Sequence, residues 1–215
     1  TLQSSANGSV MLTSSEVARY SVSSQATVII TMSAVTLWKA QIVQASATQM
    51  YLEIDDGAVA DTSGNLLVMP RTLPLITFVA DQTNPNLLRF DFDLNTATLV
   101  LSFDDIVDGS TIMYTAMTFQ NALMQPAATY RLTNGPLLST VNNIIQFSLS
   151  PNDRVAIAGI SNLVTNRNNT FLNIGTLAIQ NLAALNVKSI TRQVTNFTND
   201  YTNPSLLAFN LNFTT

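Results

Sequence analysis

The chain has 215 residues and a formal net charge of −4, and only 10% of its residues are charged whereas 47% are hydrophobic. It contains neither histidine nor cysteine, which excludes Ser-His-Asp catalysis, a disulfide scaffold and thiolate metal sites. Lysine and arginine form no cluster, which argues against nucleic-acid binding, and no apolar run reaches the roughly 20 residues that span a bilayer.

The first third of the chain predicts short strands separated by polar turns. Alternating apolar side chains predict a strand at residues 28–32, and further strands are expected at residues 51–54 and 73–79. Between the first two, the segment "AVTLWKAQI" is expected to place Trp38 under a sheet edge.

Two strands joined as a hairpin or as a tight strand-to-strand corner are expected next, followed by a capped helix. Apolar and polar side chains alternate in residues 88–94, as in a half-buried strand, and "TLVLSF" follows after an Asn-Thr-Ala turn. After a strand at residues 145–149, Ser150 stands at an N-cap position before proline, which predicts a short helix over residues 151–160. Two more strands are expected, at residues 171–174 and 190–197.

Several segments occur twice in the same order. "DQTNPNLLRFDFDLN" from Asp81 matches "DYTNPSLLAFNLNFT" from Asp200, and "TLQSS", "VIITMS" and "MYLEI" match "TFQNA", "IQFSLS" and "TFLNI". The offset stays at about 117 to 120 residues, as expected for a tandem repeat. Many short strands bounded by Asn, Asp, Gly and Pro turns predict an all-β fold built as two-sheet sandwiches.

The Asn-Pro turn gives the expected domain boundaries. A partial repeat lacking its first strands is expected at residues 1–86, a complete repeat at residues 87–200, and the first strand of a further repeat at residues 201–215. The chain is therefore expected to be a window from a longer array.

Two motifs carry a resemblance to a known family. "LVLSFDDIVDGST" and "VADTSGNLL" resemble the early strand and the late "D-x-x-G-N" loop of bacterial-type immunoglobulin-like repeats. The whole unit is similar to repeat arrays in giant extracellular surface and filament proteins of microalgae and other protists. The resemblance implies tandem immunoglobulin-like β-sandwich repeats with a short helix per repeat, an extracellular or cell-surface location, and scaffolding or adhesion without a common catalytic site.

Acidic residues are the remaining candidates for chemistry. Glu53 and Asp55 could share one strand face as a glycosidase pair, but the second copy has Asn173 and Gly175 there. Calcium is the better candidate ligand, at Asp55, Asp56, Asp61, Asp81, Asp91 and Asp93. The second copy has lost most of these charges, and its "D-x-x-G-N" loop has become "NLAALN" from Asn181. Calcium at every junction is therefore not expected, no other cofactor is expected, and the loop motif is expected to carry no fixed chemistry.

Asparagine sequons are candidate glycosylation sites in a secreted protein. They lie at Asn7, Asn168, Asn196 and Asn212. Scattered aromatic side chains such as Tyr114, Tyr130 and Tyr201 are expected in core or rim packing rather than in a sugar-binding platform.

The function predicted is that of a structural module in an extracellular filament, flagellar hair or surface coat, with copies of itself as partners. Stiff linkers formed by Asn84, Pro85, Asn203 and Pro204 would limit the angle between neighbouring repeats, and exposed strand edges would associate laterally. The alternatives are an adhesin or glycan-binding module, and an accessory region of a large surface enzyme.

Overall fold

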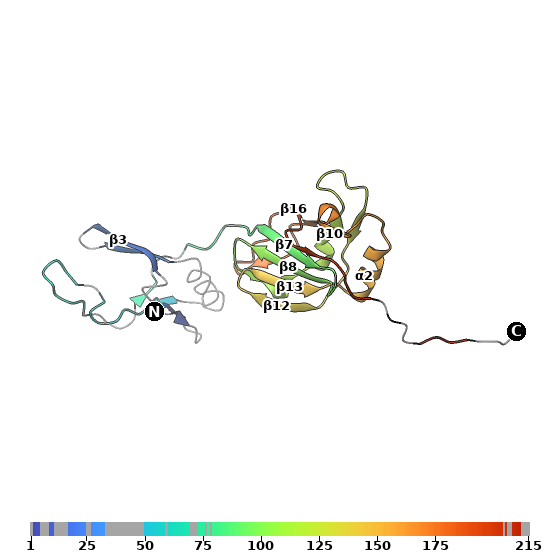
Figure 1. Ribbon diagram of the computed structural model, residues 1–215. Helices are drawn as coiled ribbons and strands as arrows, with labels where there is room; N and C mark the ends of the chain where they lie inside the picture. The colour runs from blue at the N-terminus through green and yellow to red at the C-terminus, as the bar shows by residue number, and fades with distance from the viewer. Residues whose placement is uncertain are drawn as a thin grey trace. The chain divides into compact units, whose positions relative to one another are not determined.

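The computed structural model describes residues 2–4, 9–10, 17–24, 27–32, 50–58, 60–68, 73–75, 77, 79–203, 205 and 208–211. The chain divides into two compact units, Thr1–Pro85 with Gln180–Leu185, and Asn86–Ile179 with Asn186–Thr215. In the described part the structure consists mostly of β-strands with one short α-helix (Figure 1), so the all-β prediction is confirmed. Trp38 and the rest of the "AVTLWKAQI" segment lie outside the described residues.

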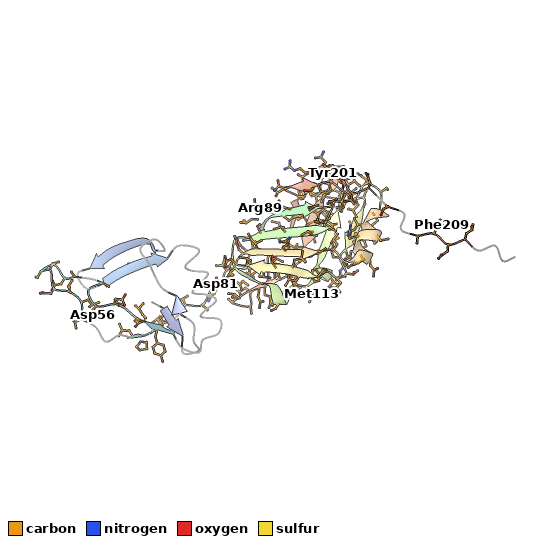
Figure 2. All side chains as sticks on the ribbon, turned by 60° about the horizontal axis from the view of Figure 1, so that its bottom comes forward. Asp56, Asp81, Arg89, Met113, Tyr201 and Phe209 are labelled. Atoms are coloured by element: carbon orange, nitrogen blue, oxygen red, sulfur yellow. The ribbon has the colours of Figure 1, made fainter. Side chains whose placement is uncertain are left out.

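A five-stranded sheet forms one layer of the second unit, with the strand order β12-β13-β8-β7-β17. Its strands are β7 (Leu87–Asp93), β8 (Thr98–Phe103), β12 (Leu137–Val141), β13 (Ile144–Ser148) and β17 (Phe197–Thr198). The expected hairpin is confirmed, because β7 and β8 pair antiparallel across a turn at residues 94–97. Arg89 projects outward from β7 (Figure 2), on the polar side of the alternating pattern.

A four-stranded sheet with the order β11-β10-β14-β16 forms the other layer. Its strands are β10 (Met117–Gln120), β11 (Thr129–Arg131), β14 (Phe171–Ile174) and β16 (Ile190–Gln193). The rings of Phe92 and Phe119, one from each sheet, lie 5.5 Å apart between their centroids. Both rings belong to one continuous cluster of buried apolar side chains, so the two sheets pack face to face as a sandwich.

Helix α2 (Pro151–Ala158) begins where the sequence predicts, because the Ser150 hydroxyl accepts a hydrogen bond from the Asp153 N–H at 3.1 Å. It ends two residues earlier than expected. The fully buried Asp153 carboxylate ties this helix to β11, since it accepts hydrogen bonds from the Tyr130 hydroxyl at 2.8 Å and the Thr133 hydroxyl at 2.7 Å. Burial raises the pKa of Asp153, but the hydrogen bonds from Thr133 and Tyr130 outweigh it and hold the pKa below its ordinary value.

The single strand predicted at residues 190–197 is wrong, because the chain changes sheets within it. β16 ends at Gln193, and the next residues pair with β7 of the other layer: the Thr195 N–H donates to the Phe90 carbonyl at 2.8 Å, and the Phe92 N–H donates to the Asn196 carbonyl at 2.9 Å. β17 then continues parallel to β7. Alternation of apolar residues predicts a strand but carries no information about which sheet it joins.

The described residues of the first unit also form two sheets. One contains β1 (Leu2–Ser4), β2 (Ser9–Val10), β5 (Met50–Leu52) and β6 (Leu73–Pro74) in the order β2-β1-β5-β6. The other is an antiparallel pair, β3 (Val17–Ser24) and β4 (Thr27–Met32). The strand expected at residues 73–79 is only two residues long among those described.

Corresponding strands of the two units pair in the same register. Leu2 pairs with Leu52 in the first unit, and Phe119 pairs with Leu172 in the second. The next pair along each ladder joins a glutamine to an aromatic residue in both cases, Gln3 to Tyr51 and Gln120 to Phe171.

Shorter elements connect these sheets. They are β9 (Val107–Asp108), β15 (Gln180–Asn181) and the 3-10 helices η1 (Gly109–Thr111), η2 (Tyr114–Ala116) and η3 (Arg167–Asn169). No helix in the described ranges has the length and apolar content to cross a membrane.

The strand predicted near the C-terminus is not formed in residues 208–211. Phe209, labelled in Figure 2, is 77% exposed, whereas the corresponding Phe90 of β7 is fully buried. A strand is stabilised by pairing, and β7 pairs with both β8 and β17. In residues 208–211 the same sequence pattern is not paired as a strand.

Candidate functional site

The proposed carboxylate pair does not share a strand face. β5 ends at Leu52, one residue before Glu53, and Asp55 lies at the start of a turn in which its carbonyl accepts a hydrogen bond from the Ala58 N–H at 3.2 Å. The premise of a glycosidase pair on one strand is therefore wrong.

The calcium candidates have local hydrogen-bonding roles. Asp93 accepts hydrogen bonds from two backbone N–H groups of its own turn, and Asp91 Oδ1 accepts from the N–H and the side-chain amide of Asn196 at 3.1 and 3.0 Å. Asp55 and Asp56 are exposed. Across the residues that the structure describes, no group of three or more acidic side chains is placed to hold a metal ion. Calcium binding stays a prediction.

The sequons differ in whether the asparagine amide that would carry the sugar is already hydrogen-bonded. Asn168 is exposed, whereas the Asn196 Nδ2 is already engaged with Asp91 at 3.0 Å. Asn7 and Asn212 lie outside the described residues. Glycosylation stays a prediction, and the geometry favours Asn168 over Asn196.

The "D-x-x-G-N" loop of the first unit is organised by the Asp61 side chain. Its Oδ1 accepts hydrogen bonds from the N–H groups of Ser63 and Asn65 at 2.9 and 2.8 Å, and its Oδ2 accepts from the Asn65 amide at 2.8 Å. Gly64 adopts φ +84°, where L side chains are strained. The Asn65 side chain is the main cause of a lowered pKa at Asp61, with further backbone donors and a small opposing effect of burial.

The loop that begins at Asn181 adopts the same turn, although its first side chain is an amide rather than a carboxylate. The expectation that the loop motif carries no fixed chemistry stays a prediction. Asn181 Oδ1 accepts hydrogen bonds from the N–H groups of Ala183 and Leu185 at 3.0 and 2.9 Å. Ala184 takes the place of Gly64 with φ 59°. Asn181 is only 2% exposed, and its amide replaces the carboxylate of Asp61. The signal in the sequence was an Asp or Asn at corresponding positions of the two copies.

The linker turn before Pro85 holds the partner of this amide. Asp81 Oδ1 accepts a hydrogen bond from the Thr83 N–H at 2.8 Å, and Asp81 Oδ2 accepts one from the Asn181 amide at 3.0 Å. The Asn181 amide also lies 3.4 Å from the Thr83 carbonyl, to which it donates. The linker and the loop are thus joined by side-chain hydrogen bonds between residues far apart in sequence.

The second linker turn has the same local geometry. Asp200 Oδ1 accepts a hydrogen bond from the Thr202 N–H at 2.8 Å, and the Thr202 hydroxyl donates to the Asn95 side chain at 2.6 Å. Of the predicted linker residues, Pro85 is buried, Asn84 is half-buried, Asn203 is exposed and Pro204 lies outside the described residues.

An apolar hollow lies beside Asp200. Its volume is about 650 Å³, and α2 forms one wall at the end of the sandwich from which the C-terminal segment leaves (Figure 1). The apolar side chains that line it include Phe92, Leu94, Leu149, Ile157, Leu163 and Val164. Asp200 and Arg154 are its charged lining residues.

The outer edge of the five-stranded sheet is apolar and uncharged. In β12, Leu137, Leu138 and Val141 are 40%, 52% and 59% exposed, and the strand contains no charged residue. Edge strands of soluble proteins are usually protected by charge or proline. β12 thus has the character of an association surface.

Comparison with known proteins gives no family. No protein-family model matches the chain, and no curated protein matches it. Among solved structures it is similar to the N-terminal part of the bacterial S-layer protein SbsC, with 12% identity, a TM-score of 0.37, and coverage of 60% of this chain and 26% of that one. It is also similar to the S-layer protein rSbsC(31-844), with 12% identity, a TM-score of 0.36 and coverage of 15% of that chain. For surface layer protein SbsC, domains 1-6, the identity is 11%, the TM-score is 0.37 and the coverage of that chain is 16%.

The chain thus spans about a quarter or less of the length of these surface-layer proteins, and 60% of it is covered by each match. TM-scores this low carry no argument about fold or role. The resemblance to immunoglobulin-like arrays of protists stays a prediction.

Proposed function

We propose that this chain is a structural part of an extracellular filament, flagellar hair or surface coat, built from tandem immunoglobulin-like β-sandwich repeats. The observation that carries the proposal is the matching strand register of the two units. Leu2 with Leu52 and Phe119 with Leu172 occupy corresponding positions of sheets that have the same strand order.

A second sheet in each unit supports the same relation. Val22 pairs with Val28 in β3 and β4, and Thr140 pairs with Ile145 in β12 and β13. The offset between these corresponding residues is again close to 118. Chance similarity of short motifs would not place pairs of residues in the same ladder positions of two sheets, because a one-residue slip turns every side chain to the other face.

The proposed role is mechanical. The complete sandwich buries its own core, with Phe90, Phe103 and Phe147 fully buried, so it does not depend on a partner for folding. The linker before it is short, its proline is buried, and its Asp81 is held by Asn181. Such a linker restricts the angle between modules, whereas a Gly-Ser linker would allow free rotation.

Lateral contacts would use the uncharged surfaces. With 10% charged residues the protein repels its copies weakly, and β12 offers an exposed edge of Leu137–Val141 for strand pairing. Both features favour dense side-by-side packing of chains.

Immunogold electron microscopy of the cells that make this protein tests the proposal. An antibody raised against the folded chain is expected to label filaments, hairs or a coat at a regular spacing of one or two sandwich lengths. Labelling of isolated molecules, together with saturable binding of the recombinant chain on a glycan array, would instead identify an adhesin.

A further inference from the structure

The two linker turns are alike in geometry, but only the first is hydrogen-bonded to the Asn181 side chain. Asp81 and Asp200 each accept a hydrogen bond at 2.8 Å from the N–H two residues later. The second carboxylate oxygen of Asp81 accepts the Asn181 amide. Within the described part of the chain, the second oxygen of Asp200 accepts no hydrogen bond, and Asp200 is exposed.

Asp200 also borders the apolar hollow beside α2. A surface that combines an apolar depression with one free acceptor suits a partner with apolar side chains and one amide donor.

The loop held by Asp81 has this composition. The segment "GTLAIQNLAALNV", residues 175–187, contains no charged residue, and its Leu177 is 59% exposed. Its polar side chain at the contact is the Asn181 amide, which donates to Asp81 Oδ2. Such a loop can enter an apolar hollow without stripping water from an ion.

On these grounds we propose that the hollow beside α2, with Asp200 at its rim, is the docking site for the Asn181-type loop of a following module of the same kind. The argument for this occupant is continuity with a contact already present, because the preceding turn of this chain binds that loop through the same carboxylate. The contact is head-to-tail, with different surfaces on the two modules, and so extends into an open-ended array. The inference rests on the proposed function and adds the surface by which modules join.

A chain in which residues 85–203 occur twice in tandem provides the test, since the second copy then follows the first copy's Asp200. The natural chain contains no cysteine, so introduced thiols react alone. The test pair is Tyr201→Cys in the first copy with Ala183→Cys in the second, joined by a short bis-maleimide, so that Asp200 and Asn181 stay intact. Gln82→Cys with Ala183→Cys of the first copy is the positive reference, and it also reports that the fold is intact; all three positions are exposed.

The matched control replaces the loop position by an exposed one elsewhere, pairing the first copy's Tyr201→Cys with Leu138→Cys of the second. Docking raises the effective concentration of the test thiols, so we expect cross-linking at least about tenfold faster than in the control pair. A test pair that reacts no faster than the control pair, in a chain whose reference pair reacts normally, overturns the proposal.

A second variant tests the hollow itself. Val155 lines the hollow and is 75% exposed, whereas Val141 is 59% exposed on β12. In the first copy of the doubled chain, Val155→Glu is expected to slow the test cross-link about fivefold, because docking must then desolvate a carboxylate. Val141→Glu is expected to leave the cross-linking rate unchanged. Equal rates in the two variants would show that the hollow is not part of the docking site.

These results are separable from the proposed function. Failure of the cross-link with regular gold labelling of filaments would mean that modules join through other surfaces. Rapid cross-linking without any filament or coat would retain the docking site and reject the filament.

Discussion

The loops that begin at Asp61 and Asn181 form the same turn in different surroundings. In each, the first side chain accepts from the N–H groups two and four residues later, its own N–H donates to the carbonyl four residues later, and its carbonyl accepts from the N–H three residues later. The Asp61 loop is exposed, whereas Asn181 is 2% exposed.

The comparison shows that the turn requires a side-chain oxygen at its first position rather than a charge. An amide supplies that oxygen and adds a donor, which the Asn181 loop uses to bind Asp81. A carboxylate at the buried position would face the carboxylate of Asp81 without a donor between them. Burial and the facing carboxylate together account for asparagine at this position.

The substitution Asn181→Asp places a carboxyl group where the buried turn has an amide. Of the substitutions considered, it is expected to lower the folding stability the most. The new carboxyl keeps the turn but is buried against Asp81, so its pKa in the folded state rises above the unfolded value of about 3.9. The unfolded chain then loses its proton first as pH rises, and stability falls with pH above about 4. We expect a loss of about 3 kcal/mol at pH 7 and a smaller loss at pH 4, measured by urea unfolding with hydrogen exchange at Ala183 and Leu185.

The matched control is Asp61→Asn, which makes the reverse exchange in the exposed loop. It is expected to leave stability nearly unchanged, because the side chain is exposed. An Asn181→Asp variant as stable as the parent at pH 7 would show that charge at this position is not discriminated.

Replacing Asn181 and Asp61 by alanine distinguishes the contribution of side-chain burial to stability from that of the turn itself. Asn181→Ala removes a buried side chain that accepts from two backbone N–H groups and donates to Asp81, which costs about 2 kcal/mol. Asp61→Ala removes an exposed side chain whose partners water can reach, so we expect a smaller loss. The same unfolding measurement compares them, and equal losses would contradict the role given to burial.

Local signals in the sequence predicted the fold well, whereas long-range contacts were missed. The β7–β8 hairpin, β14 and the Ser150 cap follow from alternation, turn residues and capping, all of which act over a few residues. The crossing from β16 to β17 could not be predicted, because it is set by pairing with β7, a strand about 100 residues earlier in the chain.

In the candidate site, too, the sequence predicted the local features and missed the long-range contacts. Asn84 and Pro85 marked the linker because Asn-Pro restricts the backbone locally. The contact of Asn181 with Asp81 was missed because the two residues are 100 positions apart, and the shared turn was missed because the glycine of the loop motif had become alanine. A comparison of the two copies by hydrogen-bonding capacity, rather than by residue identity, would have found it.

The fourth position of the turn offers a smaller test. Ala184 has φ 59° and Gly64 has φ 84°. A left-handed conformation costs alanine roughly 1 kcal/mol, partly offset because glycine loses more entropy on folding. Ala184→Gly is expected to raise stability by about 0.5 kcal/mol and Gly64→Ala to lower it by about 1 kcal/mol in urea unfolding. Opposite signs for the two changes support one shared turn, and equal signs would contradict it.

Lowering the pH is expected to change the Asp61 loop but not the Asn181 loop, and this is the smallest of the expected effects. The Asn65 side chain and backbone N–H groups lower the pKa of Asp61, so the ionised form stabilises the folded turn. A lowered pKa gives a contribution that is present above the unfolded value of about 3.9 and is lost as pH falls through the folded one. In an NMR titration from neutral to acid pH, the amide resonances of Ser63 and Asn65 are therefore expected to move below about pH 4, while the amide of Ala183, which faces the non-titrating Asn181 oxygen, keeps its position. Movement of the Ala183 resonance together with that of Ser63 would contradict the view that the Asn181 turn is held by an uncharged acceptor.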